Sequence, residues 1–161
     1  MSNLQKRLNE LFEYVDGDLY RRITVQGSPA GNKVGWVNST GYKWVNFDRK
    51  KMLMHRVVFV MFHGYEPALI DHIDGDKTNN KIENLREATK SQNGFNRKIH
   101  TNNRSGCKNV CWSKQSNCWI VKLRVNKKLI YFGRYKDLDL ADLVAHEARS
   151  IYHGEFLKGN A

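Results

Sequence analysis

The first hydrophobic positions of the chain follow helical spacing, at Leu4, Leu8, Leu11 and Phe12. Ser2 and Gln5 have the spacing of a capping box at the start of this helix. Beyond it, residues 42–47 alternate as a strand does, and residues 48–50 fit a hairpin turn. Residues 1–50 are therefore predicted to form a β-rich scaffold behind an N-terminal helix, without catalytic residues.

A second helix is predicted in the middle of the chain, from His55 to His63. The segment is apolar, and Gly64 and then Pro67 follow it, as is typical of a helix end. The two histidines are better suited to packing or to phosphate contact than to catalysis.

The last third of the chain alternates as an antiparallel sheet and then becomes helical. Residues 119–125 and 129–132 are predicted strands joined by a turn, and residues 138–152 a helix with Asp137 as its N-cap. The inner stripe of this helix is expected to consist of Leu140, Val144, Ala148 and Ile151. We expect the helix to cover one face of the sheet and to leave the other face exposed.

Composition excludes several classes of protein. There is no run of ~18 apolar residues, so no membrane span is expected, and the amphipathic start does not fit a signal peptide. The three cysteines are odd in number and close together, which argues against a disulfide framework and favours a reducing compartment. A cytoplasmic protein with no membrane partner is the prediction.

Charge changes this picture because it is concentrated in one segment. The chain carries 27 Lys and Arg against 16 Asp and Glu, a formal net charge of +11. Residues 101–136 hold nine basic residues and no acidic one, with Trp112, Trp119, Tyr131 and Phe132 among them. A basic stretch of this kind is typical of a polyanion partner, so nucleic acid is predicted in preference to a merely solvated surface.

The densest cluster of chemically active residues lies within residues 70–97. A predicted strand ends in Asp71 and His72, a loop of Asp, Gly and Asn follows, and capping-box spacing predicts a helix from Thr89 with Asn93 on its first turn. Such an arrangement can hold one divalent ion between Asp71 and Asn93 and leave His72 as a base. An imidazole with a pKa near ~6.5 can take a proton from water. A hard cation on oxygen ligands can stabilise charge on a phosphate.

These segments resemble the HNH endonucleases of the homing type that phages and mobile introns carry. The likeness rests on the Asp-His-Ile-Asp-Gly-Asp run at 71–76, the Asn-Asn-x-Ile-x-Asn-Leu-Arg run at 79–86, and the spacing of Thr89 and Asn93. The preceding residues 54–58 are also similar to the family.

The resemblance implies that His72 is the general base and that Asn84 shapes the loop of a ββα-metal centre. It also implies that Asp71 and Asn93 hold Mg²⁺, or another divalent cation such as Mn²⁺; Asn93 stands where the family name has a histidine. The implied activity is site-specific hydrolysis of a phosphodiester in double-stranded DNA, without a small-molecule cofactor. One centre per chain predicts a monomer that nicks one strand.

Two alternatives stay open. A DNA-binding regulator with an inactive HNH centre would share the motif, and an RNA-binding or ribosome-associated protein would share the charge. A calcium-binding EF-hand is excluded, because a loop that starts at Asp74 has Leu85 at its twelfth position, where that motif needs Glu.

Residues 105–156 resemble a DNA-binding domain of the Apetala-two type, known from plant ethylene-response regulators and from phage endonucleases. The likeness rests on Ser105-Gly106, Val110, Trp112, Trp119, Val121, Phe132-Gly133, Tyr135 and the helix that ends at 153–156. It implies a three-stranded sheet in the major groove, whose predicted contacts are Lys108, Trp112, Lys114, Trp119, Lys122, Arg124, Lys127, Lys128 and Arg134. At least one of the two tryptophans is expected to pack under the helix instead.

The predicted fold class is α+β. Residues 1–100 are expected to form an HNH nuclease domain, with the scaffold over 1–50 and a ββα-metal core over 51–100. Residues 101–161 are expected to form a three-stranded antiparallel sheet packed on one helix. Cys107, Cys111 and Cys118 raise a zinc alternative, but their spacing is not that of a zinc finger, and small half-buried residues are the preferred interpretation.

Overall fold

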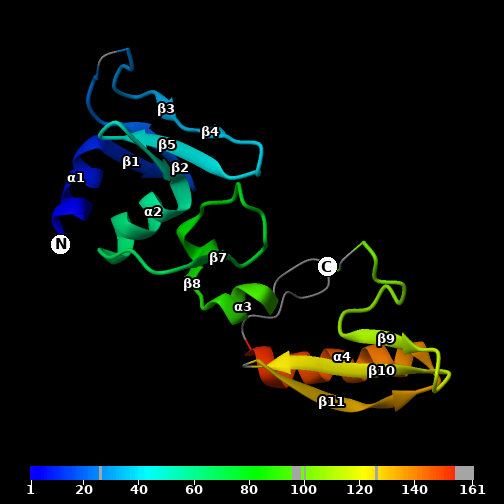
Figure 1. The fold of residues 1–161 in the computed structure, drawn as a ribbon. Helices are drawn as coiled ribbons and strands as arrows, with labels where there is room; N and C mark the ends of the chain where they lie inside the picture. Colours follow the sequence, from blue (N-terminus) through cyan, green and yellow to red (C-terminus); the bar gives the residue numbers. More distant parts are fainter. Residues whose placement is uncertain (26, 96–98, 100, 126, 155–161) are drawn as a thin grey trace. The chain divides into compact units, whose positions relative to one another are not determined.

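The computed structural model describes residues 1–25, 27–95, 99, 101–125 and 127–154, which form small antiparallel sheets and helices, a mixed α+β structure (Figure 1). The chain divides into two compact units, Met1–Thr89 and Lys90–Ala161, and each is described by itself. This division falls before the domain boundary predicted between residues 100 and 101. No helix among the described residues is long and apolar enough to cross a membrane.

The N-terminal helix α1 (Asn3–Leu11) begins where the pattern predicts, because Ser2 caps it. Ser2 Oγ accepts a hydrogen bond from the backbone N of Gln5 at 3.2 Å. The reciprocal half of the capping box does not form. Gln5 is buried and its Nε2 donates to the Met61 carbonyl at 3.0 Å, so its side chain joins α1 to the second helix.

Two three-stranded antiparallel sheets form the scaffold. They have the orders β1-β2-β3 and β4-β5-β6, with bounds β1 Phe12–Val15, β2 Asp18–Arg21, β3 Lys33–Val34, β4 Trp36–Val37, β5 Lys43–Phe47 and β6 Lys50–Leu53. Asp48 and Arg49 both have positive φ and form the predicted tight turn between β5 and β6. Because Lys-Lys-Met-Leu does not alternate, β6 was not predicted, and the scaffold extends past residue 50.

Helix α2 (Met54–His63) is the centre of the hydrophobic core of the first unit. Val57, Val58 and Val60 are fully buried and pack with Leu8 and Phe12. The helix ends as predicted at Gly64, whose φ of 79° lies in the left-handed region that glycine adopts without strain.

Residues 70–87, which contain the cluster of Asp, His and Asn residues, form a two-stranded sheet. Strand β7 (Ile70–His72) pairs antiparallel with β8 (Leu85–Glu87), so that Asp71 lies opposite Arg86. A loop over residues 73–81 and a 3₁₀ turn, η1 (Ile82–Asn84), connect them, and helix α3 (Lys90–Phe95) follows in the second unit. The order strand, loop, strand, helix agrees with the predicted ββα centre, whose metal-bound arrangement stays a prediction.

The second unit contains an antiparallel sheet of order β11-β10-β9 with helix α4 (Leu138–His153) along one face (Figure 1). The strands are β9 Val110–Ser113, β10 Cys118–Val125 and β11 Lys128–Tyr135. Asp137 caps α4 as predicted, because its Oδ1 accepts from the backbone N of Leu140 at 2.7 Å.

The buried face of α4 differs from the predicted stripe. Leu140 and Ile151 are 48% and 76% exposed, so their assignment to the core is wrong. Ala148 is buried and Val144 packs against the core as predicted, and Ala141 and Ala145 complete the face toward the sheet. Small side chains let the helix approach the valines of β9 and β10 closely, whereas larger ones would hold it away, and hydrophobicity alone does not reveal this preference.

Candidate active site

Asp71 occupies the middle of β7 and is paired across the strand with Arg86. Its Oδ2 accepts two hydrogen bonds from the guanidinium, from Nε at 3.1 Å and from Nη2 at 3.0 Å. The two side chains are 6% and 15% exposed. The pair compensates a carboxylate that burial alone would destabilise, and it holds that carboxylate in a defined position.

His72 is the next residue of β7, and strand alternation directs its side chain to the opposite face from Asp71. It is 5% exposed. Its Nε2 lies 3.1 Å from Asn80 Oδ1, and its ring meets His55 edge-on, with centroids 5.1 Å apart and an interplanar angle of 82°. The Tyr42 ring lies 6.2 Å away. The candidate base therefore belongs to a buried cluster of rings and one amide.

His55 enters this cluster from the first turn of α2 and is also 5% exposed. Burial lowers the pKa of His55 to about 3, and the neighbouring His72 and Arg56 act in the same direction. Among the residues that the structure describes, its Nδ1 has no hydrogen-bond partner. His55 is therefore a neutral ring at physiological pH.

The low pKa of His55 predicts that the free energy of unfolding falls below pH ~6.5. In the unfolded chain this imidazole titrates near ~6.5, so at lower pH the unfolded state binds a proton that the folded state does not. The loss from His55 should be about 1.4 kcal/mol per pH unit, or about 2 kcal/mol by pH ~5. Urea unfolding at a series of pH values measures it.

His55→Phe is the comparison for this measurement, because it keeps a buried ring that cannot bind a proton. The difference in stability between wild type and variant should be constant above pH ~7.5 and should change by about 1.4 kcal/mol per unit below ~6.5. Parallel stability curves for the two proteins down to pH ~5 would show that His55 does not carry this dependence.

Asn84 holds the loop over residues 73–81 closed. Its Oδ1 accepts from the Asp74 backbone N at 3.0 Å, and its Nδ2 donates to Asp74 Oδ1 at 3.0 Å and to the Asn79 carbonyl at 2.8 Å. Burial acts to raise the pKa of Asp74, but the hydrogen bonds that it accepts from Asn79, Asp76 and Asn84 hold the pKa below its usual value. These bonds give Asn84 the contacts that a loop-shaping residue needs.

The first scaffold hairpin supports the end of this loop. The Tyr14 hydroxyl accepts from the Ile82 backbone N at 3.0 Å, and Asp16 pairs with Lys81 at 2.7 Å. Gly17 allows the close approach, since a Cβ there would lie 2.9 Å from the Lys81 backbone N. The scaffold, in which the sequence indicated no catalytic residue, therefore positions the loop directly.

Asn93, the second predicted metal ligand, lies on α3 in the second unit with an exposed side chain. Asp71 belongs to the first unit, so the two predicted ligands come from different units. Within the described ranges, no group of three or more His, Cys, Asp or Glu side chains is arranged to hold a metal ion. Within the described residues Cys107, Cys111 and Cys118 form no disulfide, and the preference for small half-buried residues over a zinc site stays a prediction.

The predicted DNA contacts Lys122, Arg124 and Arg134 share one face of the second sheet. Along β10, the exposed Lys122 and Arg124 alternate with the buried Val121 and Leu123, so they project away from α4. Arg134 on β11 lies directly opposite Ile120, which alternates onto the same side of β10 as Lys122 and Arg124. We call these three residues the basic face.

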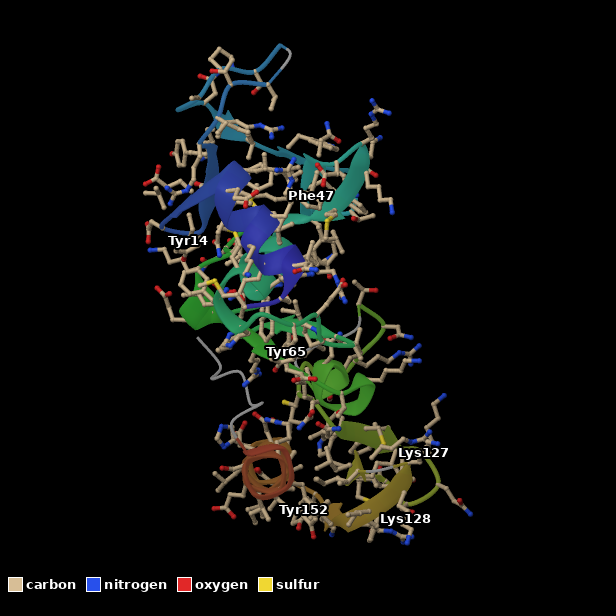
Figure 2. The ribbon with its side chains drawn as sticks, turned by 90° about the vertical axis from the view of Figure 1, so that its left-hand side faces the viewer. Tyr14, Phe47, Tyr65, Lys127, Lys128 and Tyr152 are labelled. Carbon is tan, nitrogen blue, oxygen red and sulfur yellow. The ribbon has the colours of Figure 1, made fainter. Side chains whose placement is uncertain are left out.

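Further cations surround the basic face. Lys127 and Lys128 lie at the turn between β10 and β11 (Figure 2), and Lys114 is exposed after β9. In the part of the chain that the structure describes, neither they nor the basic face form an ion pair. Helix α4, by contrast, carries Asp139, Asp142 and Glu147. Positive charge therefore gathers on the sheet side of this unit and negative charge on the helix.

The remaining predicted contacts are less exposed. Trp112 and Trp119 meet edge-to-face at 4.8 Å between centroids; Trp112 is 42% exposed, whereas Trp119 packs against the core beneath α4. One tryptophan therefore packs under the helix, as the second interpretation predicts, and Trp119 is not part of the exposed surface. Lys108 is half-buried, and its carbonyl accepts from Arg149 Nη1 at 2.8 Å.

Three residues of the candidate site were not foreseen from the sequence. Arg86 could have been identified by counting register across an antiparallel return, which places it opposite Asp71. Asn80 stands beside Asn79 in a loop where both look like turn residues, so nothing in the sequence separates them. Tyr42 comes from a distant hairpin, and only the fold brings it to His72.

Known proteins match this chain in the region of the site. Residues 52–95 match the HNH endonuclease family. The chain is 35% identical over 91 residues to Protein 3.8 of Escherichia phage T7, across 55% of this chain and 73% of that protein. It is 38% identical over 84 residues to the uncharacterized HNH endonuclease L560 of Acanthamoeba polyphaga mimivirus, across 50% of this chain and 44% of that protein. No solved structure matches.

Proposed function

Because the chain belongs to the family of phage T7 Protein 3.8 and carries an HNH endonuclease domain over residues 52–95, we propose that it is a divalent-metal-dependent, site-specific DNA endonuclease of the homing type. The observation that carries the proposal is the pair of neighbouring buried side chains on β7, Asp71 and His72, which face opposite ways beside a loop that Asn84 closes.

In this proposal His72 is the general base. A nitrogen of its ring takes a proton from a water molecule, whose oxygen attacks the phosphorus in line with the leaving 3′ oxygen. The bond from phosphorus to that oxygen breaks, and the oxygen takes up a proton from solvent water, leaving a 5′ phosphate and a 3′ hydroxyl. Asn84 keeps the loop beside His72 in one conformation, so that less reorganisation precedes attack.

The oxygen donors present suit a hard cation. Asp71 would supply a carboxylate oxygen and Asn93 an amide oxygen, and Mg²⁺ or Mn²⁺ accepts such ligands while keeping several waters. When bound there, the ion supplies positive charge to the scissile phosphate. Arg86 holds the Asp71 carboxylate in place from the neighbouring strand.

The test is cleavage of supercoiled plasmid that carries the DNA flanking the gene, with Mg²⁺ or with chelator. Wild type should give nicked circles with Mg²⁺ and none with chelator. Asn93→Ala should cut about 10- to 100-fold more slowly at limiting Mg²⁺. Because Asn93 is exposed, this variant should fold normally, and it controls for contaminating nuclease.

The other outcomes identify the alternatives. If wild type shifts duplex DNA in a gel but does not cut it with Mg²⁺, Mn²⁺ or Ca²⁺, the protein is a DNA-binding regulator with an inactive centre. If structured RNA displaces duplex DNA from the protein at equal concentration, the RNA-binding interpretation replaces both.

We propose further that the second unit is an Apetala-two type DNA-binding domain that places its sheet on the duplex. The separation of charge supports this orientation, since the basic face and its neighbours oppose the acids of α4. Trp112 lies directly opposite Trp119 and therefore on the helix side of the sheet, so the proposed contact surface does not include it. The protein would act as a monomer in the cytoplasm of the host cell and nick one strand per visit.

Replacing all three residues of the basic face by alanine should weaken DNA binding without unfolding the sheet. If each meets a phosphate, the slope of log binding constant against log salt should become shallower by about 2 to 3. Filter binding at several salt concentrations measures it. Lys6→Ala, which removes an exposed cation from α1, is the control and should change the slope by less than ~0.5.

A further inference from the structure

Asn80 is the one polar side chain that hydrogen-bonds His72 within the described residues. Its Oδ1 lies 3.1 Å from His72 Nε2, and the residue is 1% exposed. It belongs to the loop over residues 73–81, near the end that Tyr14 and Asp16 support through Ile82 and Lys81. The acceptor is therefore held by the scaffold and does not depend on an exposed loop.

The chemistry of this contact determines where the imidazole carries its proton. An amide oxygen only accepts, so the Nε2 facing it must be the protonated nitrogen, and the lone pair of the neutral ring lies on Nδ1. Among the described residues, Nδ1 of His72 has no hydrogen-bond partner. This nitrogen is not fully buried. Nδ1 is thus the nitrogen left for a water molecule.

Stability alone does not account for an amide at this position. Asn80 Nδ2 is buried and finds no partner in the described part of the chain, and an unmet buried donor is destabilising. A leucine has the same branched arrangement of side-chain heavy atoms and no polar donor to leave unmet. What the amide adds is its one hydrogen bond to His72.

The ring of His55 restricts His72 in a second way. This ring meets the His72 ring edge-on, with centroids 5.1 Å apart, and its centroid lies 5.5 Å from that of Tyr42. Such contacts leave the His72 ring little room to turn about its bond to Cβ. His55 is neutral, so it adds no charge beside the base.

We propose that Asn80 is a positioning residue, which fixes His72 in the tautomer protonated on Nε2 and presents Nδ1 to the attacking water, with His55 limiting rotation of the ring. The inference rests on the proposed function in one respect, that His72 is the base. The inference adds that Asn80 leaves Nδ1 of His72 available to the water molecule.

The first test needs no substitution. In ¹⁵N-labelled wild-type protein at pH ~7.5, the His72 ring should show a slowly exchanging proton bonded to Nε2, because buried hydrogen-bonded N–H groups exchange slowly. Resonances are assigned by their loss in His72→Gln. A proton found on Nδ1 of His72 instead would overturn the proposal.

The second test compares two substitutions that keep the branched shape of the asparagine side chain. Asn80→Leu removes the acceptor and should lower kcat about 10- to 100-fold with little change in KM. Asn80→Asp keeps an oxygen acceptor and should recover kcat to within about threefold of wild type. The Nε2 proton signal should be lost in the first variant and retained in the second.

Gln5→Leu is the matched control, because Gln5 is also a buried amide with one side-chain hydrogen bond, to the Met61 carbonyl at 3.0 Å, and it does not touch His72. It should keep the wild-type kcat, whereas Asn80→Leu should not. If both variants lose kcat equally, or if Asn80→Leu keeps wild-type kcat after losing the Nε2 proton, Asn80 has no positioning role. If His72→Ala itself cuts normally, the failure lies with the proposed base, and the proton measurement still reports the Asn80 contact.

Discussion

His72→Ala is expected to lower the rate of DNA cleavage by about 10²- to 10⁴-fold while leaving DNA affinity unchanged, which is the range that a general base contributes. Binding should persist because the cations proposed to meet DNA belong to the sheet of the second unit, whereas His72 belongs to the first unit. Single-turnover cleavage and a gel shift on the same DNA separate the two quantities.

The substitution also opens a cavity, which provides a second measurement. His72 is buried against His55 and Tyr42, so alanine leaves a space the size of an imidazole. Added imidazole should restore part of the cleavage rate. His63→Ala, on an exposed histidine of α2, should cut as wild type does. A His72→Ala protein that cuts at the wild-type rate would remove His72 from the mechanism.

Arg86→Leu is expected to lower the free energy of unfolding of the first unit by about 3 to 5 kcal/mol, because it leaves the buried Asp71 carboxylate without its guanidinium partner. Hydrogen exchange of the backbone amides of β7 and β8 reports the stability of that unit. Arg7→Leu is the control: its bonds to Glu10 and Asp48 are solvent-exposed, and their loss should cost no more than ~1 kcal/mol.

The same variant tests the metal ligand. If Asp71 binds the ion, Mg²⁺ should stabilise Arg86→Leu more than it stabilises wild type, because the ion then replaces the missing positive charge. Equal stabilisation of the two proteins by Mg²⁺ would argue that Asp71 is not the ligand. Loss of less than ~1 kcal/mol in Arg86→Leu without metal would show that the pair is not needed for folding.

Features that depend on nearby residues could be predicted from the sequence. Ser2 and Asp137 cap the helices that their spacing indicates, and Gly64 ends α2. Asp48 and Arg49 turn between strands. In each case the hydrogen bond or backbone angle that forms the cap or turn lies within a few residues of the sequence pattern that predicts it. The fold does not have to be known.

Features decided by packing could not be predicted in this way. The face that α4 buries depends on how close the sheet comes, which favours alanines over Leu140 and Ile151. Gln5 does not complete the capping box, because its side-chain amide donates to the carbonyl of Met61 on another helix. The surroundings of His72 depend likewise on Tyr42 and Asn80, which the fold brings from two separate loops.

The loop over residues 73–81 is ordered by the protein's own side chains, through Asn84 from within and through Tyr14 and Lys81 at its end. Fixing a backbone residue costs about 1 to 2 kcal/mol of conformational entropy. Since folding has already met that cost, neither metal nor DNA has to supply it on binding. The affinity of the centre for its ion should therefore reflect charge and ligand chemistry, with little penalty for ordering the loop.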